Sequence, residues 1–208
     1  MAKFPEPPSP QELETPGPAD IHHLPARTRV WRIYFRGGRQ PTSWDEFRHF
    51  GPTSARFDHH LEPARVQERG VLYAAPLGPT CLAEVYQDAR TVDLRAGDPW
   101  LVEFELTRIV PLLDLTSLWV TRAGASGAMD SGPRPRARRW SRVIYEACPD
   151  IEGLLYRSSM DPQGVALALY ERAKSAVPSR PETHRALADP VLFDAIAQAA
   201  FQLGYSLV

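Results

Sequence analysis

Short apolar segments, separated by glycine and proline and arranged in no regular order, are the feature of this 208-residue sequence that most limits its fold. In residues 29–35 and 101–106 the side chains alternate in the manner of half-buried strands. Further short strands are expected over residues 70–75, 109–115, 153–158 and 164–170. Because the segments do not follow a regular βαβ order, the pattern predicts a single α+β domain.

Helices are predicted from their start and stop signals. Residues 78–88 begin with Gly-Pro-Thr, which places a proline in the first turn. Helices are also expected over residues 44–50 and 140–147. Near the C-terminus, Asp189 and Pro190 form a helix start and Gly204 can end that helix.

The chain is predicted to have three parts. Seven prolines fall within residues 1–25, so residues 1–26 are expected to be a flexible tail. A domain spans residues 27–175, and residues 176–208 form a helical extension packed on it. Within the domain, residues 121–139 contain three glycines and, at 134–139, a cluster of four arginines, without periodicity, which predicts a long mobile loop with solvated arginines.

Composition narrows the possible partners. Lys and Arg total 24 against 25 for Asp and Glu, a net charge of −1, which argues against direct nucleic-acid binding and against a membrane-surface protein. No apolar run approaches the ~20 residues that span a bilayer, and no secretory signal is recognised. Cys81 and Cys148 are too few for a disulfide framework or a four-cysteine zinc site, and both are expected to be buried. We expect a soluble cytoplasmic protein that holds no metal.

Familiar catalytic motifs are missing from the sequence. It contains no phosphate-binding P-loop, no dinucleotide-binding glycine motif, no nucleophile elbow and no zinc-protease helix. His59 and His60 form the one adjacent histidine pair of the folded domain. Neighbouring side chains on an extended segment point in opposite directions, so we expect this pair to be surface residues rather than metal ligands.

Five polar or charged residues stand out because they interrupt apolar segments. Arg32 lies within a strand, Arg56 precedes Phe57, Tyr73 interrupts an aliphatic run, Glu84 lies on an apolar helix and Ser158 ends a strand. Each alone has an ordinary structural explanation. Together they supply two cations, an aromatic ring, a carboxylate and a hydroxyl, which suit a charged nucleotide ligand.

The order of these residues resembles the RES domain family. The motifs are Val-Trp-Arg-Ile (30–33), Ala-Arg-Phe-Asp (55–58), Val-Leu-Tyr-Ala-Ala (71–75), Ala-Glu-Val (83–85) and Gly-Leu-Leu-Tyr-Arg-Ser (153–158). The resemblance covers residues 29–170. It departs from the family at Phe57 and Asp58, where a Trp-Asn pair is usual. RES proteins are best known as toxins paired with an antitoxin that has a helix-turn-helix domain, so the resemblance implies such a partner.

The resemblance also implies an ADP-ribosyltransferase-like split β-sheet core with flanking helices, and cleavage of NAD+ by hydrolysis or phosphorolysis. Carried over by position, the catalytic residues would be Arg32, Glu84 and Ser158, and the substrate-binding residues Arg56 and Tyr73. NAD+ would be the substrate, without a further cofactor. A protein ADP-ribosyltransferase and an inactive nucleotide-binding module remain as alternatives.

Overall fold

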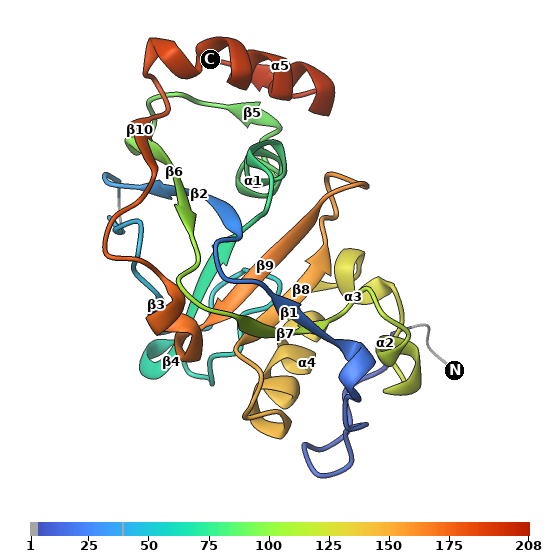
Figure 1. Ribbon diagram of the computed structural model, residues 1–208. Helices are drawn as coiled ribbons and strands as arrows, with labels where there is room; N and C mark the ends of the chain where they lie inside the picture. Colours follow the sequence, from blue (N-terminus) through green and yellow to red (C-terminus); the bar gives the residue numbers. More distant parts are fainter. Residues whose placement is uncertain (1–3, 39) are drawn as a thin grey trace.

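The computed structural model describes residues 4–38 and 40–208 and contains two main β-sheets that meet at one corner (Figure 1). The larger sheet has six strands, in the order β1 (Ile21–Leu24), β7 (Val110–Asp114), β8 (Gly153–Arg157), β9 (Val165–Tyr170), β4 (Arg65–Ala74) and β3 (Arg48–Gly51). Neighbouring strands are antiparallel except β7 and β8, which run parallel.

The smaller sheet is antiparallel, with the order β10 (Thr183–Ala186), β6 (Pro99–Glu105) and β2 (Arg29–Phe35). It joins the larger sheet where Trp31 and Ala75 exchange two backbone hydrogen bonds, with N···O distances of 2.7 and 2.8 Å. A short parallel pair, β5 (Thr91–Val92) and β11 (Ser206–Leu207), lies beside it. The predicted α+β fold with a split sheet and flanking helices is confirmed.

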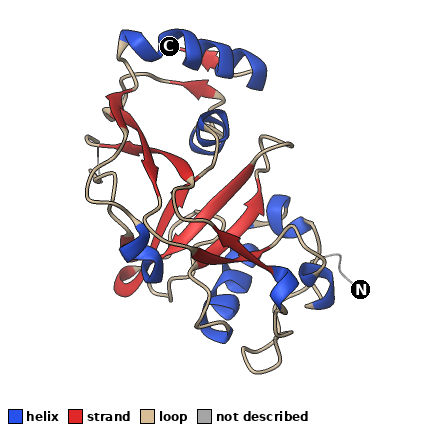
Figure 2. Cartoon of the chain, viewed as in Figure 1, coloured by secondary structure: helices blue, strands red, loops and turns tan. Residues whose placement is uncertain are grey.

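Helices cover both sheets (Figure 2). Those packed on the larger sheet are α2 (Trp119–Arg122), α3 (Ala128–Ser131) and α4 (Arg134–Ala147), whereas α1 (Gly78–Val85) lies against β2 and α5 (Phe193–Leu203). Short 3-10 helices occur at Pro18–Asp20, Glu171–Ala176 and Pro190–Leu192. No helix in the described part of the chain is long and apolar enough to cross a bilayer.

The N-terminal segment is packed rather than flexible, which corrects the expectation for residues 1–26. Residues 4–24, here called the N-terminal strap, insert Phe4 (4% exposed) and Leu13 (7% exposed) into the core beneath α4. The strap also accepts hydrogen bonds from two buried tryptophans, Trp140 Nε1 to the Pro5 carbonyl at 3.0 Å and Trp119 Nε1 to the Glu14 carbonyl at 2.9 Å. Residues 1–3 lie outside the described part.

The expected mobile loop at residues 121–139 is also wrong. This segment contains the end of α2, all of α3 and the first turns of α4. Proline stands in the first turn of α4, where its missing N–H costs nothing. Glu6 of the strap forms ion pairs with Arg136 and Arg139, with N···O distances of 3.1 and 2.5 Å, so two of the four arginines are held by a contact far away in sequence.

Two other expectations differ from the structure. Residues 44–50 form turns and the start of β3 instead of a helix, because β3 pairs with β4. The extension at residues 176–208 is only partly helical, since β10 and β11 complete two sheets there. Its helix is confirmed: the Asp189 carboxylate accepts from Val191 N at 3.0 Å, and Gly204 ends α5 at a φ of 69°.

Candidate functional site

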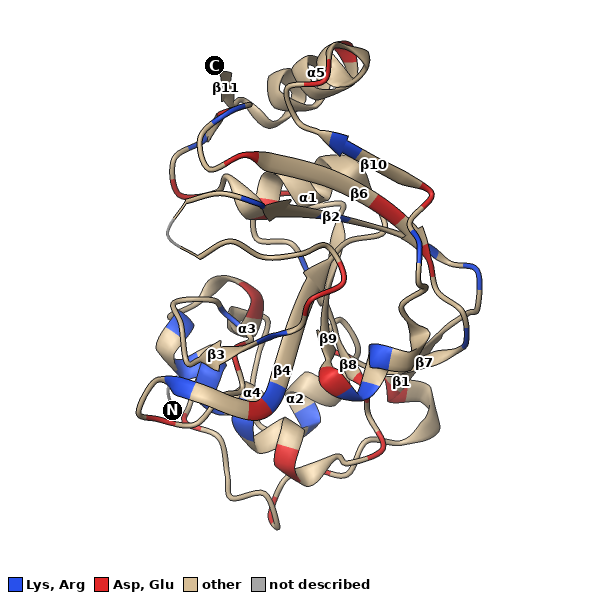
Figure 3. Ribbon diagram, turned by 90° about the vertical axis from the view of Figure 1, so that its left-hand side faces the viewer, with Lys and Arg blue, Asp and Glu red and all other residues tan. Residues whose placement is uncertain are grey.

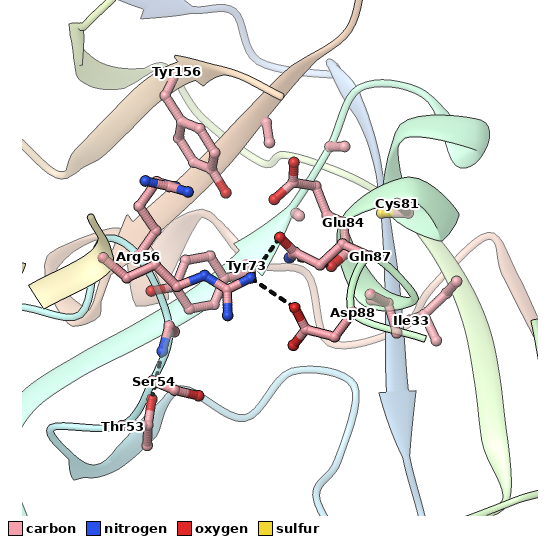
Figure 4. A pocket seen from close by; sticks show the side chains of 16 residues that line it. Ile33, Thr53, Ser54, Arg56, Tyr73, Cys81, Glu84, Gln87, Asp88 and Tyr156 are labelled. Atoms are coloured by element: carbon pink, nitrogen blue, oxygen red, sulfur yellow. Dashed lines mark hydrogen bonds and ion pairs between the residues drawn. The ribbon is translucent and has the colours of Figure 1, made fainter. Parts of the chain in front are cut away.

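A cavity of about 290 Å³ opens where the two sheets meet (Figure 4). Its walls come from parts of the chain that are far apart in sequence. They include Ile33 on β2, residues 53–56 after β3, Tyr73 on β4, Glu84 on α1 and Arg134 at the start of α4. Asp88 and Tyr156 line it as well, so the cavity combines two carboxylates, two guanidinium groups and two phenols.

Glu84 is fixed in the last turn of α1 by the turn that follows β8. Ser158 Oγ donates a hydrogen bond to Glu84 Oε1 at 2.6 Å. The same turn is tied to the start of α1, because Thr80 Oγ1 donates to Asp161 Oδ2 at 2.6 Å. The first bond holds the carboxylate directly, and the second fixes the turn that carries Ser158.

Burial raises the pKa of the Glu84 carboxyl, although the hydrogen bond from Ser158 and the charge of Arg56 oppose the shift. The carboxylate also stands at the C-terminal end of α1, where the helix dipole disfavours a negative charge. A cation placed in the cavity would relieve both effects. Perturbed carboxyls of this kind are typical of functional sites.

Arg56 enters the cavity from the loop after β3. Its Nη1 donates to the carbonyl of Gly132, just before α4, at 2.6 Å. Burial and the nearby Arg134 lower the pKa of Arg56, and the Glu84 carboxylate raises it. Two positive side chains thus face the same cavity.

Arg134 is a lining residue that the sequence analysis missed. The sequence predicts a solvated loop there, yet Arg134 Nη2 donates to Gln87 Oε1 at 2.7 Å and to Asp88 Oδ1 at 3.1 Å; the dashed lines that end on Gln87 and Asp88 in Figure 4 mark these contacts. Figure 3 shows further basic residues along α4. The signal that could have placed Arg134 is the pair of prolines flanking it, which marks a helix start.

Two tyrosines form the inner wall. Burial raises the pKa of the hydroxyl of both Tyr73 and Tyr156, so both stay protonated and can donate hydrogen bonds. Tyr156 packs against Phe57 with ring centroids 4.5 Å apart. Tyr156 belongs to the motif at residues 153–158 but is not among the five residues that the sequence predicts for the site.

Arg32 is placed differently from the other four predicted residues. It is only 9% exposed and does not line the cavity, as Arg56, Tyr73 and Glu84 do, nor does it bond to a lining residue as Ser158 does to Glu84. Within the described residues, Arg32 Nη1 has no hydrogen-bond acceptor. Burial lowers the pKa of this guanidinium to about 10. The structure therefore brings together Arg56, Tyr73, Glu84 and Ser158 and leaves Arg32 beside them.

The histidine pair is buried, which corrects its expected surface position. Both His59 and His60 are 0% exposed, and their rings stack with centroids 5.4 Å apart. His59 also stacks on Tyr145 at 4.4 Å. Among the described residues, no group of three or more His, Cys, Asp or Glu side chains is arranged to hold a metal ion. Cys81 and Cys148 are buried and free, as expected.

Asp58, which departs from the family motif, anchors the loop that carries Arg56. Its carboxylate accepts from His60 Nδ1 at 2.6 Å and from Thr53 N at 2.7 Å, and pairs with Arg48 at 3.0 Å. Burial opposes its ionisation, but the His60 hydrogen bond and the Arg48 charge outweigh burial and hold the pKa of Asp58 well below its usual range. Its charge is thus already paired within the loop.

Comparison with known proteins agrees with this fold. The RES domain family model matches residues 29–190. The structure is similar to a chain in the crystal structure of the MbcT–MbcA toxin–antitoxin complex of M. tuberculosis, with a TM-score of 0.55, 14% sequence identity, and coverage of 85% of this chain and 92% of that chain. Curated protein sequences give no match. Because the family model spans most of the sequence, the chain belongs to the RES domain family.

Proposed function

We propose that this protein is the toxin of a toxin–antitoxin pair and that it cleaves the nicotinamide–ribose bond of NAD+. One observation carries the proposal: the buried carboxylate of Glu84, held by Ser158, faces a cavity that also presents Arg56. Family membership and the likeness to a chain of a toxin–antitoxin complex support the toxin role.

The reaction would place positive charge on the ribose ring as the glycosidic bond breaks, as in glycoside hydrolysis. Glu84 would stabilise that charge, and it would do so most strongly in the transition state. Nicotinamide leaves as a neutral molecule, so no general acid is required. The hydrogen bond from Ser158 would hold the carboxylate in position, and water or phosphate would complete the reaction.

The remaining side chains would bind the substrate. Arg56 suits a phosphate group, because a planar guanidinium can bind two oxygens at once. The rings of Tyr73 and Tyr156 would flank the nicotinamide or its ribose. The buried Arg32 Nη1, which has no acceptor among the described residues, would gain a partner when ligand binds.

The proposed partner is an antitoxin with a helix-turn-helix domain, one segment of which would occupy the cavity and exclude NAD+. The similar solved structure contains a toxin together with its antitoxin, which supports a partner of this kind.

The test is nicotinamide release from NAD+ by the purified, antitoxin-free protein, with and without phosphate. Glu84→Gln keeps the shape and the hydrogen-bond acceptor but removes the charge, so turnover should fall by about two to three orders of magnitude. Glu68→Gln, an exposed position on β4, is the matched control and should keep full turnover. Wild-type protein that leaves NAD+ intact, or a Glu84→Gln variant with normal turnover, would contradict the proposal.

A further inference from the structure

We propose that Arg134 is a second ligand for the diphosphate of the substrate and that, without substrate, it closes the mouth of the cavity as a latch with Gln87 and Asp88. This inference rests on the function proposed above. It deepens that function by assigning a residue that lies outside the five motifs of the sequence analysis.

The first support is the charge on the cavity wall. Arg56 and Arg134 both line the cavity, and the proximity of Arg134 lowers the pKa of Arg56. Two like charges on one wall oppose each other unless an anion lies between them. A diphosphate carries two negative charges and would satisfy both guanidinium groups.

The second support is the position of Arg134 at the first residue of α4. A cation there is disfavoured by the helix dipole, and the first turn of α4 has no acidic residue. Its ion-pair partner, Asp88, has a side chain that is 83% exposed. An exposed pair contributes little to stability, so it can open at little cost. Glu6 forms ion pairs with Arg136 and Arg139, whereas Arg134 lines the cavity.

The third support is the size of the cavity. At about 290 Å³ it is just below the roughly 300–1,000 Å³ typical of pockets for drug-sized ligands. A dinucleotide is larger than such a ligand. With its nicotinamide riboside half beside Glu84, its diphosphate would therefore extend towards the mouth, where Arg134 reaches Gln87 and Asp88.

The experiment compares Arg134→Ala with Arg138→Ala, which removes the same charge from the same helix. Arg138 does not line the cavity and forms no side-chain hydrogen bond or ion pair with the described residues. We expect Arg134→Ala to weaken ADP-ribose binding by about tenfold or more and to raise the KM for NAD+ with little change in kcat. Cleavage of nicotinamide riboside, which has no phosphate, should be unchanged. Arg138→Ala should bind ADP-ribose, and cleave NAD+ and nicotinamide riboside, as the wild type does.

Asp88→Asn tests the latch. Loss of the competing carboxylate should leave ADP-ribose affinity unchanged or increase it. An equal loss of affinity in Asp88→Asn and Arg134→Ala would show that the pair is only structural and would overturn the inference, as would an equal effect of Arg134→Ala on nicotinamide riboside and NAD+. If the wild type binds ADP-ribose but releases no nicotinamide, the proposed function fails, and the binding data alone decide the role of Arg134.

Discussion

Burial raises the pKa of Glu84 and of Asp130 and lowers that of Arg32, so three ionisable side chains near the junction of the sheets oppose folding in their charged forms. Residues that cost stability where no structural partner compensates them are characteristic of functional sites. A substitution that raises stability but lowers activity can therefore identify a functional residue.

Arg32 provides the first such test. Because one nitrogen of its buried guanidinium has no acceptor among the described residues, Arg32→Met should leave the melting temperature unchanged or raise it. The same change should weaken NAD+ binding if the guanidinium gains a partner from the substrate. Thermal melting and NAD+ titration measure the two effects. Lower stability with unchanged affinity would assign Arg32 a purely structural role.

The pH dependence of turnover provides the second test. Glu84 must be ionised to stabilise the ribose cation, and burial raises its pKa. Turnover should therefore fall with decreasing pH at a higher pH than an ordinary glutamate would give. A group with a raised folded-state pKa also favours folding at low pH, and that contribution is lost as pH rises through the folded pKa. Glu84→Gln should remove both dependences, which rate profiles and melting curves between pH 4 and 8 would show.

The sequence identified most of the site residues but not their contacts. Glu84 and Ser158 were both chosen, yet their hydrogen bond joins residues 74 positions apart and depends on the turn after β8. His59 and His60 were misplaced because the rule of opposite directions holds for a regular strand. In the structure their loop is folded around the Asp58 carboxylate, which brings both rings into the core.

At the scale of elements, α3 contains a buried carboxyl that should couple stability to pH. Asp130 is 9% exposed, and its Oδ1 has no hydrogen-bond partner among the described residues. Burial raises its pKa from 3.8 to about 7, even though Arg56 and Arg157 act in the opposite direction. The folded protein thus keeps this proton at a pH where the unfolded chain has lost it, and stability falls as pH rises through about 7.

We therefore expect Asp130→Asn to melt at a higher temperature than the wild type at pH 8, by about 2–4 °C for each kcal/mol regained. The difference should grow between pH 5 and pH 8. Asp150→Asn, at an exposed position after α4, is the control and should show no such trend. A constant difference across this range would mean that Asp130 does not titrate as described.

Elements were predictable where local patterning and tertiary pairing agree. The alternation in residues 29–35 matches β2, and the start and stop signals around Pro190 and Gly204 match the C-terminal helix. Residues 44–50 were predicted as a helix because local pattern does not show that β4 offers an edge for pairing. Residues 121–139 were predicted as a loop because the four arginines at 134–139 interrupt any apolar periodicity at the start of α4. In the structure, Glu6, which is distant in sequence, forms ion pairs with two of these arginines.

At the scale of the whole molecule, the N-terminal strap connects the fold to the site. The proline-rich composition of this segment predicted a flexible tail. Composition does not show that the buried indole N–H groups of Trp119 and Trp140 need hydrogen-bond acceptors, which the backbone carbonyls of the strap supply. The ring of Phe4 lies against Gly132, since a Cβ added to that glycine would come within 3.1 Å of Phe4 Cδ1. The carbonyl of the same glycine holds Arg56. The strap thus supports the backbone that positions a cavity arginine.

Comparing Phe4→Ala with Leu13→Ala separates this support from general stabilisation. Both side chains belong to the same core, and either truncation should cost about 3 kcal/mol and lower the melting temperature by roughly 6–12 °C. Only Phe4→Ala removes the contact with Gly132, so only that variant should also weaken ADP-ribose binding at a temperature where both proteins are folded. Nicotinamide riboside cleavage should be equal in the two variants, because neither change touches Glu84 or Ser158. Equal ADP-ribose affinities would mean that the strap stabilises the core without positioning Arg56.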